Sequence, residues 1–558
     1  MMNTPSRGLH PPQAVHTAEH RHPSVGEVAA EAVGHGGALS HPLPSEATLN
    51  RLLPAVLSPF DLFANKHVII LWLVNASGAA TGGPVALLYW VVGALCFYLP
   101  TVFASAQLGV LFPEDGALYS WTYHAFAADP RHGKRASFVS IFVGTCFWLI
   151  GPLAFVIGAN AFVSFLEGIL PSAWLQTSLA QPWQQGLLMI LIVLVSAFFV
   201  IQRICRLQDL INYTFLANLV ALGLIGGAGV VWVLQGHPSA TNFAHVSDWM
   251  PSPQNLGLFG LICLGYLGEP TALAMMGERS PNVRTRSVMT ALLRWGSLLV
   301  VAGYLLSTWA LLVVRGQAAL AASTNSNFEL VRLVALVFGK GLATLTVACL
   351  MLFVLISPLL YNLASSRLLL MGSIDQHLPA FFGAVSRDRV PARALWMQVL
   401  VAIFMLCIVY FVAPLFTSLG QPAQLASIVY TVVLATLTLV FMLATAFLFV
   451  NLLLLLRTCR EHLVAQRLVP LPMLQFSIGA GILCCVVVAV DTLRYSWIPQ
   501  LLPDGLWFLF VFLFLLFCIT FLIICSSVAS SEAASQRLLQ PAFTGSSAAR
   551  RDTDYDHL

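Results

Sequence analysis

Twelve apolar runs, each about as long as a bilayer-spanning helix, follow one another along most of the chain. A transmembrane helix needs about 20 apolar residues, and in lipid its backbone polar groups must be paired within the segment. Only 9% of the residues are charged, against about 25% in a soluble domain. These features predict an all-α integral membrane protein with twelve transmembrane helices. The expected cores are 64–83, 85–108, 137–167, 185–202, 209–234, 256–276, 287–314, 330–364, 394–413, 424–451, 471–491 and 505–527.

The basic residues of the connecting loops predict how the chain is oriented. With the N-terminus in the cytoplasm, the loops after odd-numbered spans hold only Arg315 and Arg494. Cytoplasmic loops carry an excess of Lys and Arg, so we expect a multi-pass protein of the cell membrane with both termini cytoplasmic. The loops after even-numbered spans hold sixteen basic residues: Arg131, Lys134, Arg135, Arg203, Arg206, Arg279, Arg284, Arg286, Arg294, Arg367, Arg387, Arg389, Arg393, Arg457, Arg460 and Arg467.

The ends of the chain differ from the spans in composition. Residues 1–50 are rich in Pro, Gly, Ser, Ala and His without an apolar period, so 1–57 is expected to be a disordered cytoplasmic tail and 528–558 a second cytoplasmic tail. The net charge of +4 does not indicate a nucleic-acid partner. The eleven Cys form no disulfide framework, and nothing predicts a cofactor or a metal site. Six His lie irregularly in the N-terminal tail: His10, His16, His20, His22, His35 and His41.

The sixth span contains residues that a continuous helix tolerates poorly. Between Leu258 and Pro281 it carries Gly265, Gly268, Glu269 and Pro270 within six positions. Proline lacks the amide hydrogen that a helix interior needs, and a carboxylate at membrane depth costs roughly 2.5–3.5 kcal/mol on insertion scales. A broken helix is tolerated at that depth only where it faces protein or a water-filled cavity. The segment therefore predicts a discontinuous helix at a polar site; the competing interpretation is a proline kink with one buried, protonated Glu.

The first span is interrupted in a similar way. Asn75, Ala76, Ser77 and Gly78 lie within it, and 82–84 (Gly-Gly-Pro) ends it. Two interrupted segments in matching positions of two halves point to the binding site of a transporter. The first and sixth spans would occupy matching positions if the chain contained two copies of a five-helix unit.

Three stretches of the chain contain motifs of a known kind. The loop after the second span reads Phe-Pro-Glu-Asp-Gly-Ala-Leu-Tyr from Phe112, with Ala-Phe at 125–126. It resembles a motif of the amino acid–polyamine–organocation (APC) transporters, a family that typically shows Phe-Pro-x-x-Gly-Gly-x-Tyr and then Ala-Phe-Gly. The stretch 265–282 is similar to the sixth-span Gly-x-Glu-Ala and Glu-x-x-x-Pro pattern, and 362–391 to the eighth-span Ser-Arg and Leu-Pro pattern. The form of the first motif looks most like the glutamate/GABA antiporter branch.

The resemblance implies a leucine-transporter-like fold. Two inverted five-helix repeats would occupy 58–451, and helices eleven and twelve, at 452–527, would be peripheral. The resemblance also implies a substrate site between the broken first and sixth helices, where unwound main chain can hold both charged ends of an amino acid. The site residues that follow are Asn75, Ala76, Ser77, Gly78, Gly265, Tyr266, Leu267, Gly268 and Glu269.

Several positions depart from the family pattern. Ala117 replaces the second Gly of the first motif, Ala127 replaces the last Gly, and Pro270 stands where Ala is usual. The first span carries Val-Asn-Ala-Ser-Gly-Ala-Ala-Thr-Gly over 74–82 in place of Gly-Ser/Thr-Gly. Small and polar residues are kept there, but the identity of the substrate does not follow.

Four further side chains are candidates for the solute pathway. Trp148 and Tyr304 could stack on a substrate, and Tyr361 and Asn362 are polar residues of the eighth span. Each could equally serve packing, because aromatic residues in spans often do.

These observations predict a secondary active transporter for an amino acid or related amine that works by alternating access. It would be an antiporter or a proton symporter with Glu269 as the titrating group, because burial raises the pKa of a carboxyl. Two alternatives stay open: a nutrient sensor that keeps a transporter fold without transport, and a polytopic membrane enzyme. The second would need clustered acid–base or metal-binding residues, which the spans do not contain. The oligomeric state does not follow from the sequence.

Overall fold

The described residues of the computed structural model form helices and turns, with an isolated β-bridge between Leu57 and Arg279 and no strand. The six His of the expected N-terminal tail lie outside these residues. The structure describes residues 43–548 apart from 54, 114, 130, 132, 171–178, 180, 202–203, 253–254, 281, 324, 387–388 and 417–421.

Ten helical segments of the described chain are long and apolar enough to cross a membrane, and a shorter apolar one covers Gly257–Leu273. The ten agree in position with the predicted runs other than the first and the sixth, except that the eighth covers Lys340–Ile374 instead of 330–364, because Glu329–Phe338 forms a separate helix. The first predicted span falls on two short helices. The ten segments are Val85–Leu111, Ala136–Ile169, Pro182–Val200, Arg206–Leu234, Thr285–Val314, Lys340–Ile374, Ala392–Leu415, Gln424–Thr458, Leu471–Arg494 and Asp504–Ser531.

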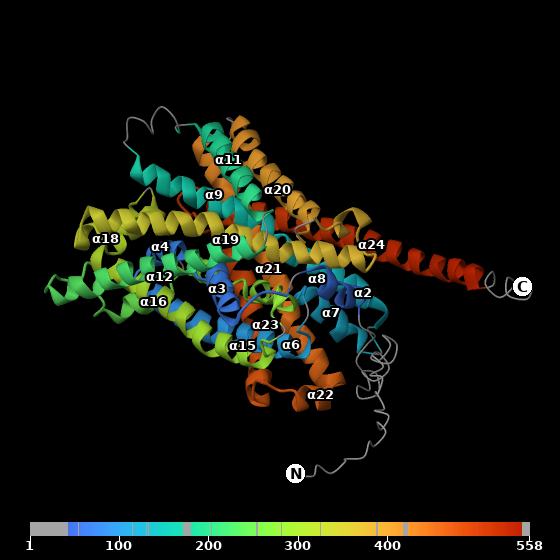
Figure 1. Ribbon diagram of the computed structural model, residues 1–558. Coiled ribbons are helices and arrows are strands. Elements are labelled where there is room, and N and C mark those ends of the chain that lie inside the picture. Colours follow the sequence, from blue (N-terminus) through green and yellow to red (C-terminus); the bar gives the residue numbers. More distant parts are fainter. Residues whose placement is uncertain are drawn as a thin grey trace, which may run out of the picture. The chain divides into compact units, whose positions relative to one another are not determined.

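The helices are named in chain order, with η for 3₁₀ and π segments (Figure 1). They are α2 (Pro44–Leu52), α3 (Pro59–Ile70), α4 (Val74–Ala80), α5 (Val85–Gly93), η1 (Ala94–Tyr98), α6 (Leu99–Leu111), α7 (Leu118–Ala127), η2 (Gly133–Arg135), α8 (Ala136–Trp148), α9 (Ile150–Ile169), α11 (Pro182–Val200), α12 (Ile204–Leu234), η3 (Val246–Trp249), α13 (Gly257–Gly265), α14 (Glu269–Leu273), η4 (Met276–Glu278), α15 (Thr285–Ala291), η5 (Leu292–Gly296), α16 (Ser297–Val314), α17 (Gln317–Ala321), η6 (Ser326–Phe328), α18 (Glu329–Phe338), α19 (Lys340–Ile374), η7 (Ala380–Gly383), α20 (Ala392–Cys407), η8 (Ile408–Val412), η9 (Ala413–Leu415), α21 (Pro422–Thr458), α22 (Arg460–Ala465), α23 (Leu471–Arg494) and α24 (Asp504–Ala548).

Both segments that were expected to be broken are interrupted. α3 ends at Ile70 and α4 begins at Val74, while α13 ends at Gly265 and α14 begins at Glu269. Gly268 has φ +113°, a conformation that is cheap only for glycine. Pro270 lies in the first turn of α14, where a helix needs no N–H from it. Pro270 therefore starts a new helix after the gap rather than kinking a continuous one.

The helix α19 lies at the centre of the packing. It contacts α9 on one side and α12 on the other, as Figure 1 shows. Residues 353 to 368 of α19 are nearly all buried, including Pro358. α3 packs on α12, α14 and α19, and α4 packs on α16. The two interrupted segments are thus enclosed by continuous helices.

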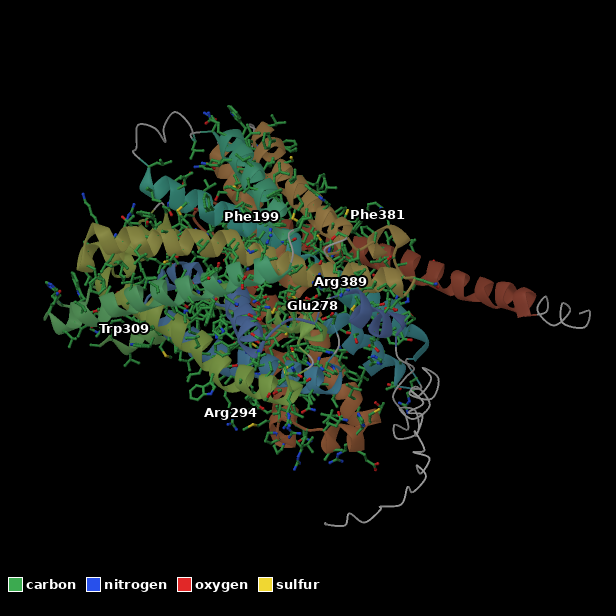
Figure 2. All side chains as sticks on the ribbon, in the orientation of Figure 1. Phe199, Glu278, Arg294, Trp309, Phe381 and Arg389 are labelled. Atoms are coloured by element: carbon green, nitrogen blue, oxygen red, sulfur yellow. The ribbon has the colours of Figure 1, made fainter. Side chains whose placement is uncertain are left out.

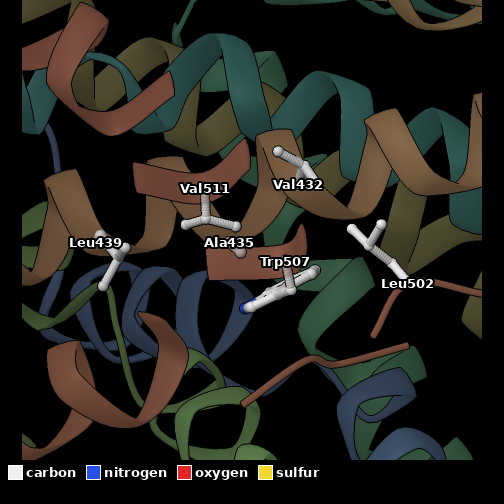
Figure 3. Packing of buried hydrophobic residues seen from close by; sticks show 6 residues of the cluster. All are labelled: Val432, Ala435, Leu439, Leu502, Trp507 and Val511. Atoms are coloured by element: carbon white, nitrogen blue, oxygen red, sulfur yellow. The ribbon is translucent and has the colours of Figure 1, made fainter. Parts of the chain in front are cut away.

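The last helix packs on α21 through a small apolar cluster. Val432, Ala435 and Leu439 of α21 meet Trp507 and Val511 of α24 (Figure 3), and Leu502 joins them. Most of the remaining apolar side chains of residues 504–531 in α24 are exposed. A helix that is apolar on its outer face suits contact with lipid.

Two helices extend into the segments that the sequence predicted as tails. α2 lies within 1–57 and α24 continues past residue 528 to Ala548. α2 is held by the buried side chains of Leu43, Leu49 and Leu53. Its Ser45 also donates two hydrogen bonds to Asp375 at the end of α19. Because residues 1–57 have fewer apolar residues than the spans and no apolar period, the sequence did not indicate that these leucines are buried.

Candidate solute site

A cavity of about 230 Å³ lies between the two interruptions. Drug-sized ligands occupy pockets of about 300–1,000 Å³, so this one suits a single small solute. It is lined by both interrupted segments together with α9, α19, α21 and η6. The lining residues are Ile69, Ile70, Trp72, Val74, Asn75, Gly78, Ile150, Ala154, Ile157, Asn160, Ala161, Leu261, Leu264, Gly265, Leu267, Ser326, Asn327, Tyr361, Tyr430 and Leu434.

Five of the residues expected at the site or the pathway line this cavity: Asn75, Gly78, Gly265, Leu267 and Tyr361. The glycines are needed because space is short around them. A Cβ added at Gly265 would lie 2.9 Å from Cη2 of Trp90, and one at Gly78 would lie 3.3 Å from Cδ2 of Leu261. A larger residue at Gly265 would meet Trp90 of α5, and one at Gly78 would meet Leu261 of the other interrupted segment.

Other expected site residues shape the interruptions without lining the cavity. Ala76 and Ser77 are fully buried, and the Ser77 hydroxyl donates to the carbonyl of Val74. The Tyr266 hydroxyl donates to the carbonyl of Trp90. A Cβ on Gly268 would lie 2.8 Å from Tyr361 Oη and from a side-chain carbon of the first segment.

Tyr304 joins the two interruptions. Its hydroxyl lies 2.6 Å from the carbonyl oxygen of Ile70 and 3.0 Å from that of Gly265, and it accepts the N–H of Trp72 at 3.1 Å. Its ring stacks on Trp90 with 4.1 Å between centroids. Buried backbone groups must find partners, so Tyr304 replaces helix hydrogen bonds that the interruptions remove. It acts on the main chain and does not line the cavity.

Tyr361 also bonds to the main chain of the first interruption. The other two pathway candidates, Trp148 and Asn362, do not line the cavity. The Tyr361 hydroxyl donates to the carbonyl of Ile69 at 2.8 Å. Trp148 lines a separate, much smaller cavity beside Tyr119. The Asn362 amide donates to the carbonyls of Gly151 and Pro358. Asn362 therefore fastens α9 to α19.

Glu269 forms a buried ion pair with Lys66 of α3. Lys66 Nζ lies 2.9 Å from Glu269 Oε1, and both side chains are almost fully buried. Lys66 also donates to the carbonyl of Leu292 at 3.0 Å and lies 3.4 Å from the Ser297 hydroxyl. The pair lies beside the cavity, since Lys66 is one turn before the first interruption and Glu269 directly follows the second. Neither residue lines the cavity.

A π segment makes room for the ammonium group. η5 covers Leu292–Gly296, and π segments often occur at functional sites. A Cβ on Gly296 would lie 3.2–3.3 Å from the Cδ and Cε of Lys66. η5 therefore offers the lysine both the Leu292 carbonyl and a glycine surface.

The three stretches that resemble family motifs meet further from the cavity. Asp115 of the first motif accepts the N–H of Gly277 at 2.9 Å, and Arg279 donates to the carbonyl of Pro113. Glu278 of the second motif pairs with Arg367 of the third, and both are buried. Figure 2 shows Glu278 amid the helices, whereas the exposed Arg294 lies at their edge. We call this set (Asp115, Gly277, Glu278, Arg279 and Arg367) the motif junction.

The sequence analysis missed Lys66 and much of the cavity wall. Lys66 had a signal, because it is a basic residue inside the first predicted span, and such residues are functional candidates by default. Ile157 and Leu434 had none, because apolar residues in spans are expected everywhere. Within the described residues, no group of three or more His, Cys, Asp or Glu could hold a metal ion.

Comparisons with known proteins agree with this architecture. A family model described as amino acid permease matches residues 62–536. An uncharacterized transporter of Legionella pneumophila is 24% identical over 355 residues, which cover 62% of this chain and 71% of the relative. The region that the family model matches includes both interruptions, the cavity and the motif junction. The chain belongs to the amino acid permease family of the APC superfamily, and it is a multi-pass membrane transporter rather than an enzyme.

Proposed function

We propose that this protein is a secondary active transporter of an amino acid or related amine, and that the cavity between the interruptions is its solute site. The observation that supports this most is the cavity itself, which is bounded by Asn75 and Gly78 of one interrupted segment and Gly265 and Leu267 of the other. Unwound main chain between half-helices is where transporters of this kind bind solutes. The charged ends of a zwitterion would meet backbone groups and helix ends there.

Twelve spans in two five-helix repeats are part of this proposal. The ten long segments become twelve when α3–α4 and α13–α14 each count as one crossing. The two interrupted segments then stand at positions one and six. The third and eighth spans, Ala136–Ile169 and Lys340–Ile374, are both long and pack on each other through α9 and α19. The basic loops favour cytoplasmic termini in the cell membrane.

Alternating access requires the chain to open on one side while it closes on the other. The Lys66–Glu269 pair and the motif junction lie in succession along α3, α14 and η4, leading away from the cavity. The N–H of Leu57 also donates to the carbonyl of Glu278 at 2.9 Å. We propose that these contacts form the gate on that side and separate when it opens.

Counterflow into proteoliposomes tests the proposal. Vesicles holding the full chain are preloaded with unlabelled amino acids or amines, and uptake of the labelled solutes is measured. Gly78→Leu would fill the cavity and is expected to reduce counterflow at least about tenfold. Gly223→Leu is the matched control, because a Cβ there meets no atom within 4 Å. The proposal fails if the folded protein supports no counterflow of any solute, or if both variants behave alike.

Exchange and proton symport predict different roles for Glu269. In symport, protonation of this carboxylate would remove the counter-charge of Lys66 and loosen α14 from α3. Glu269→Gln is then expected to flatten the pH profile of uptake. An unchanged pH profile would exclude Glu269 as the coupling group and favour exchange.

A further inference from the structure

The cavity is polar at a few points but carries no formal charge. None of its twenty lining residues is Asp, Glu, Lys, Arg or His. The nearest buried charges along the chain, Lys66 and Glu269, neutralise each other outside the lining. A charged group placed in this cavity would therefore meet no counter-charged side chain.

The wall that α9 and α21 supply is largely apolar. It presents Ile150, Ala154 and Ile157 from α9, and Tyr430 and Leu434 from α21. The one amide of α9 in the lining, Asn160, donates to the Tyr410 hydroxyl at 3.0 Å. Burying a charge without a partner costs far more than burying a neutral group, so this wall favours an apolar solute side chain.

Among their mostly apolar lining residues, the interrupted segments also supply polar groups. Asn75 and the main chain around Gly265 lie there, and so does Trp72. Trp72 is 6% exposed, and its indole N–H has no acceptor among the described residues. A buried N–H without an acceptor is costly, and a solute carboxylate would supply one. The interruptions thus suit the α-amino-acid group, and the wall of α9 and α21 suits an uncharged side chain.

We propose that the transported solute is a neutral α-amino acid with an apolar side chain of about the size of valine, leucine, isoleucine or methionine. The inference rests on the proposed transport function and narrows its substrate class. It excludes solutes with a second charged group, such as glutamate, arginine, lysine and polyamines. It also excludes γ-aminobutyrate, whose ammonium group would lie against the apolar wall.

The test compares labelled leucine, isoleucine, valine and methionine with glutamate, γ-aminobutyrate, arginine and lysine. Counterflow is measured in proteoliposomes, and equilibrium binding of each label is measured on the purified full-length protein. Leucine or one of its neutral neighbours is expected to be favoured over every charged solute by at least about 100-fold, because a site without a counter-charge leaves the extra charge unpaired.

A matched pair of variants locates the selectivity. Ile157→Asp places a carboxylate on the apolar wall, and Ile157→Asn has nearly the same shape without the charge. Ile157→Asp is expected to gain binding of lysine or arginine relative to leucine by at least about tenfold, whereas Ile157→Asn is not. Equal behaviour of the two variants would overturn the assignment of this wall to the solute side chain.

The remaining outcomes separate the two proposals. Preferred counterflow of glutamate, γ-aminobutyrate or a basic amino acid overturns the substrate inference and leaves transport standing. Leucine binding without counterflow supports the substrate inference and overturns transport. The substrate inference is overturned if protein that thermal unfolding shows to be folded neither binds any neutral amino acid nor supports its counterflow.

Discussion

Ala117 shows how a single backbone conformation explains a family motif. It has φ +32° and is fully buried at the start of α7, at the position where the APC signature carries glycine. A non-glycine residue in this region costs about 1–3 kcal/mol. The neighbouring Gly116 also has a positive φ, +82°. The turn therefore needs two residues in a left-handed conformation and contains only one glycine.

Replacing Ala117 by glycine is expected to stabilise the protein by about 1 kcal/mol, because the strain is relieved. The measurement is the midpoint of unfolding in detergent micelles. Ala104→Gly is the matched control, since Ala104 is equally buried but lies inside the regular helix α6. That variant should lose about 1 kcal/mol. A loss of the same size at Ala117 would show that its conformation is not strained.

At the scale of single residues, breaking the buried Lys66–Glu269 ion pair is expected to cost the most stability. Removing one partner of a buried ion pair costs about 3–5 kcal/mol, because the other charge is left without compensation. Lys66→Met and Glu269→Gln are each expected to destabilise the protein by that amount, and the double variant by clearly less than the sum. Denaturant titration of all three variants measures the coupling. Lys340→Met, at an exposed lysine of α19, should have no effect. Additive losses would mean that the two residues do not interact.

At the scale of elements, α2 is fastened to the core by groups that titrate. Ser45 donates through its N–H and its hydroxyl to Asp375, and Tyr119 donates to the same carboxylate. Glu46 binds Ser120 and the imidazole of His124. Burial raises the pKa of Asp375 to about 6. Burial also opposes ionisation of Glu46, but its hydrogen bonds and the His124 charge hold its pKa below the ordinary value.

These shifts predict that α2 is held more tightly at mildly acidic pH. The raised pKa of Asp375 means that this carboxylate binds a proton more strongly when α2 is docked. Protonation of Asp375 therefore stabilises the docked state at low pH, and this stabilisation is lost as pH rises through about 6. The full contribution is at most about 3 kcal/mol, at 1.36 kcal/mol per pKa unit. Glu46 acts in the opposite sense, but only as pH falls below its ordinary pKa of 4.5.

Hydrogen exchange of the α2 amides between pH 5 and pH 7.5 measures this docking, after correction for intrinsic rates. Protection is expected to fall as pH rises, and Asp375→Asn is expected to remove the dependence. Asp248→Asn, at an exposed carboxylate of η3, should leave it unchanged. Protection that rises with pH would contradict the assignment to Asp375.

At the scale of the whole molecule, the elements that the sequence predicted are those with a strong local signal. Long apolar runs marked the membrane helices from the second span onward, and glycine with proline marked both interruptions. Asn75, Gly78, Gly265 and Leu267 followed from the interruptions and line the cavity.

The remainder of the site depends on tertiary contacts that leave little trace in the sequence. Glu269 was expected to touch the solute, but in the structure it pairs with Lys66, which lies 203 positions earlier in the chain. Tyr304 was a candidate either for stacking on a solute or for packing, and in the structure it bridges the two interruptions. Ile157 and Leu434 are common residues for any span, and only the fold brings them to the cavity.

The most direct test of the account is a cryo-electron microscopy map of the protein in lipid nanodiscs with a saturating concentration of the neutral amino acid that it transports. The account predicts density for one solute in the cavity beside Trp72 and Asn75, with its side chain toward Ile157 and Leu434. Solute density elsewhere in the molecule, or α3–α4 and α13–α14 as two unbroken helices with no space between them, would contradict it.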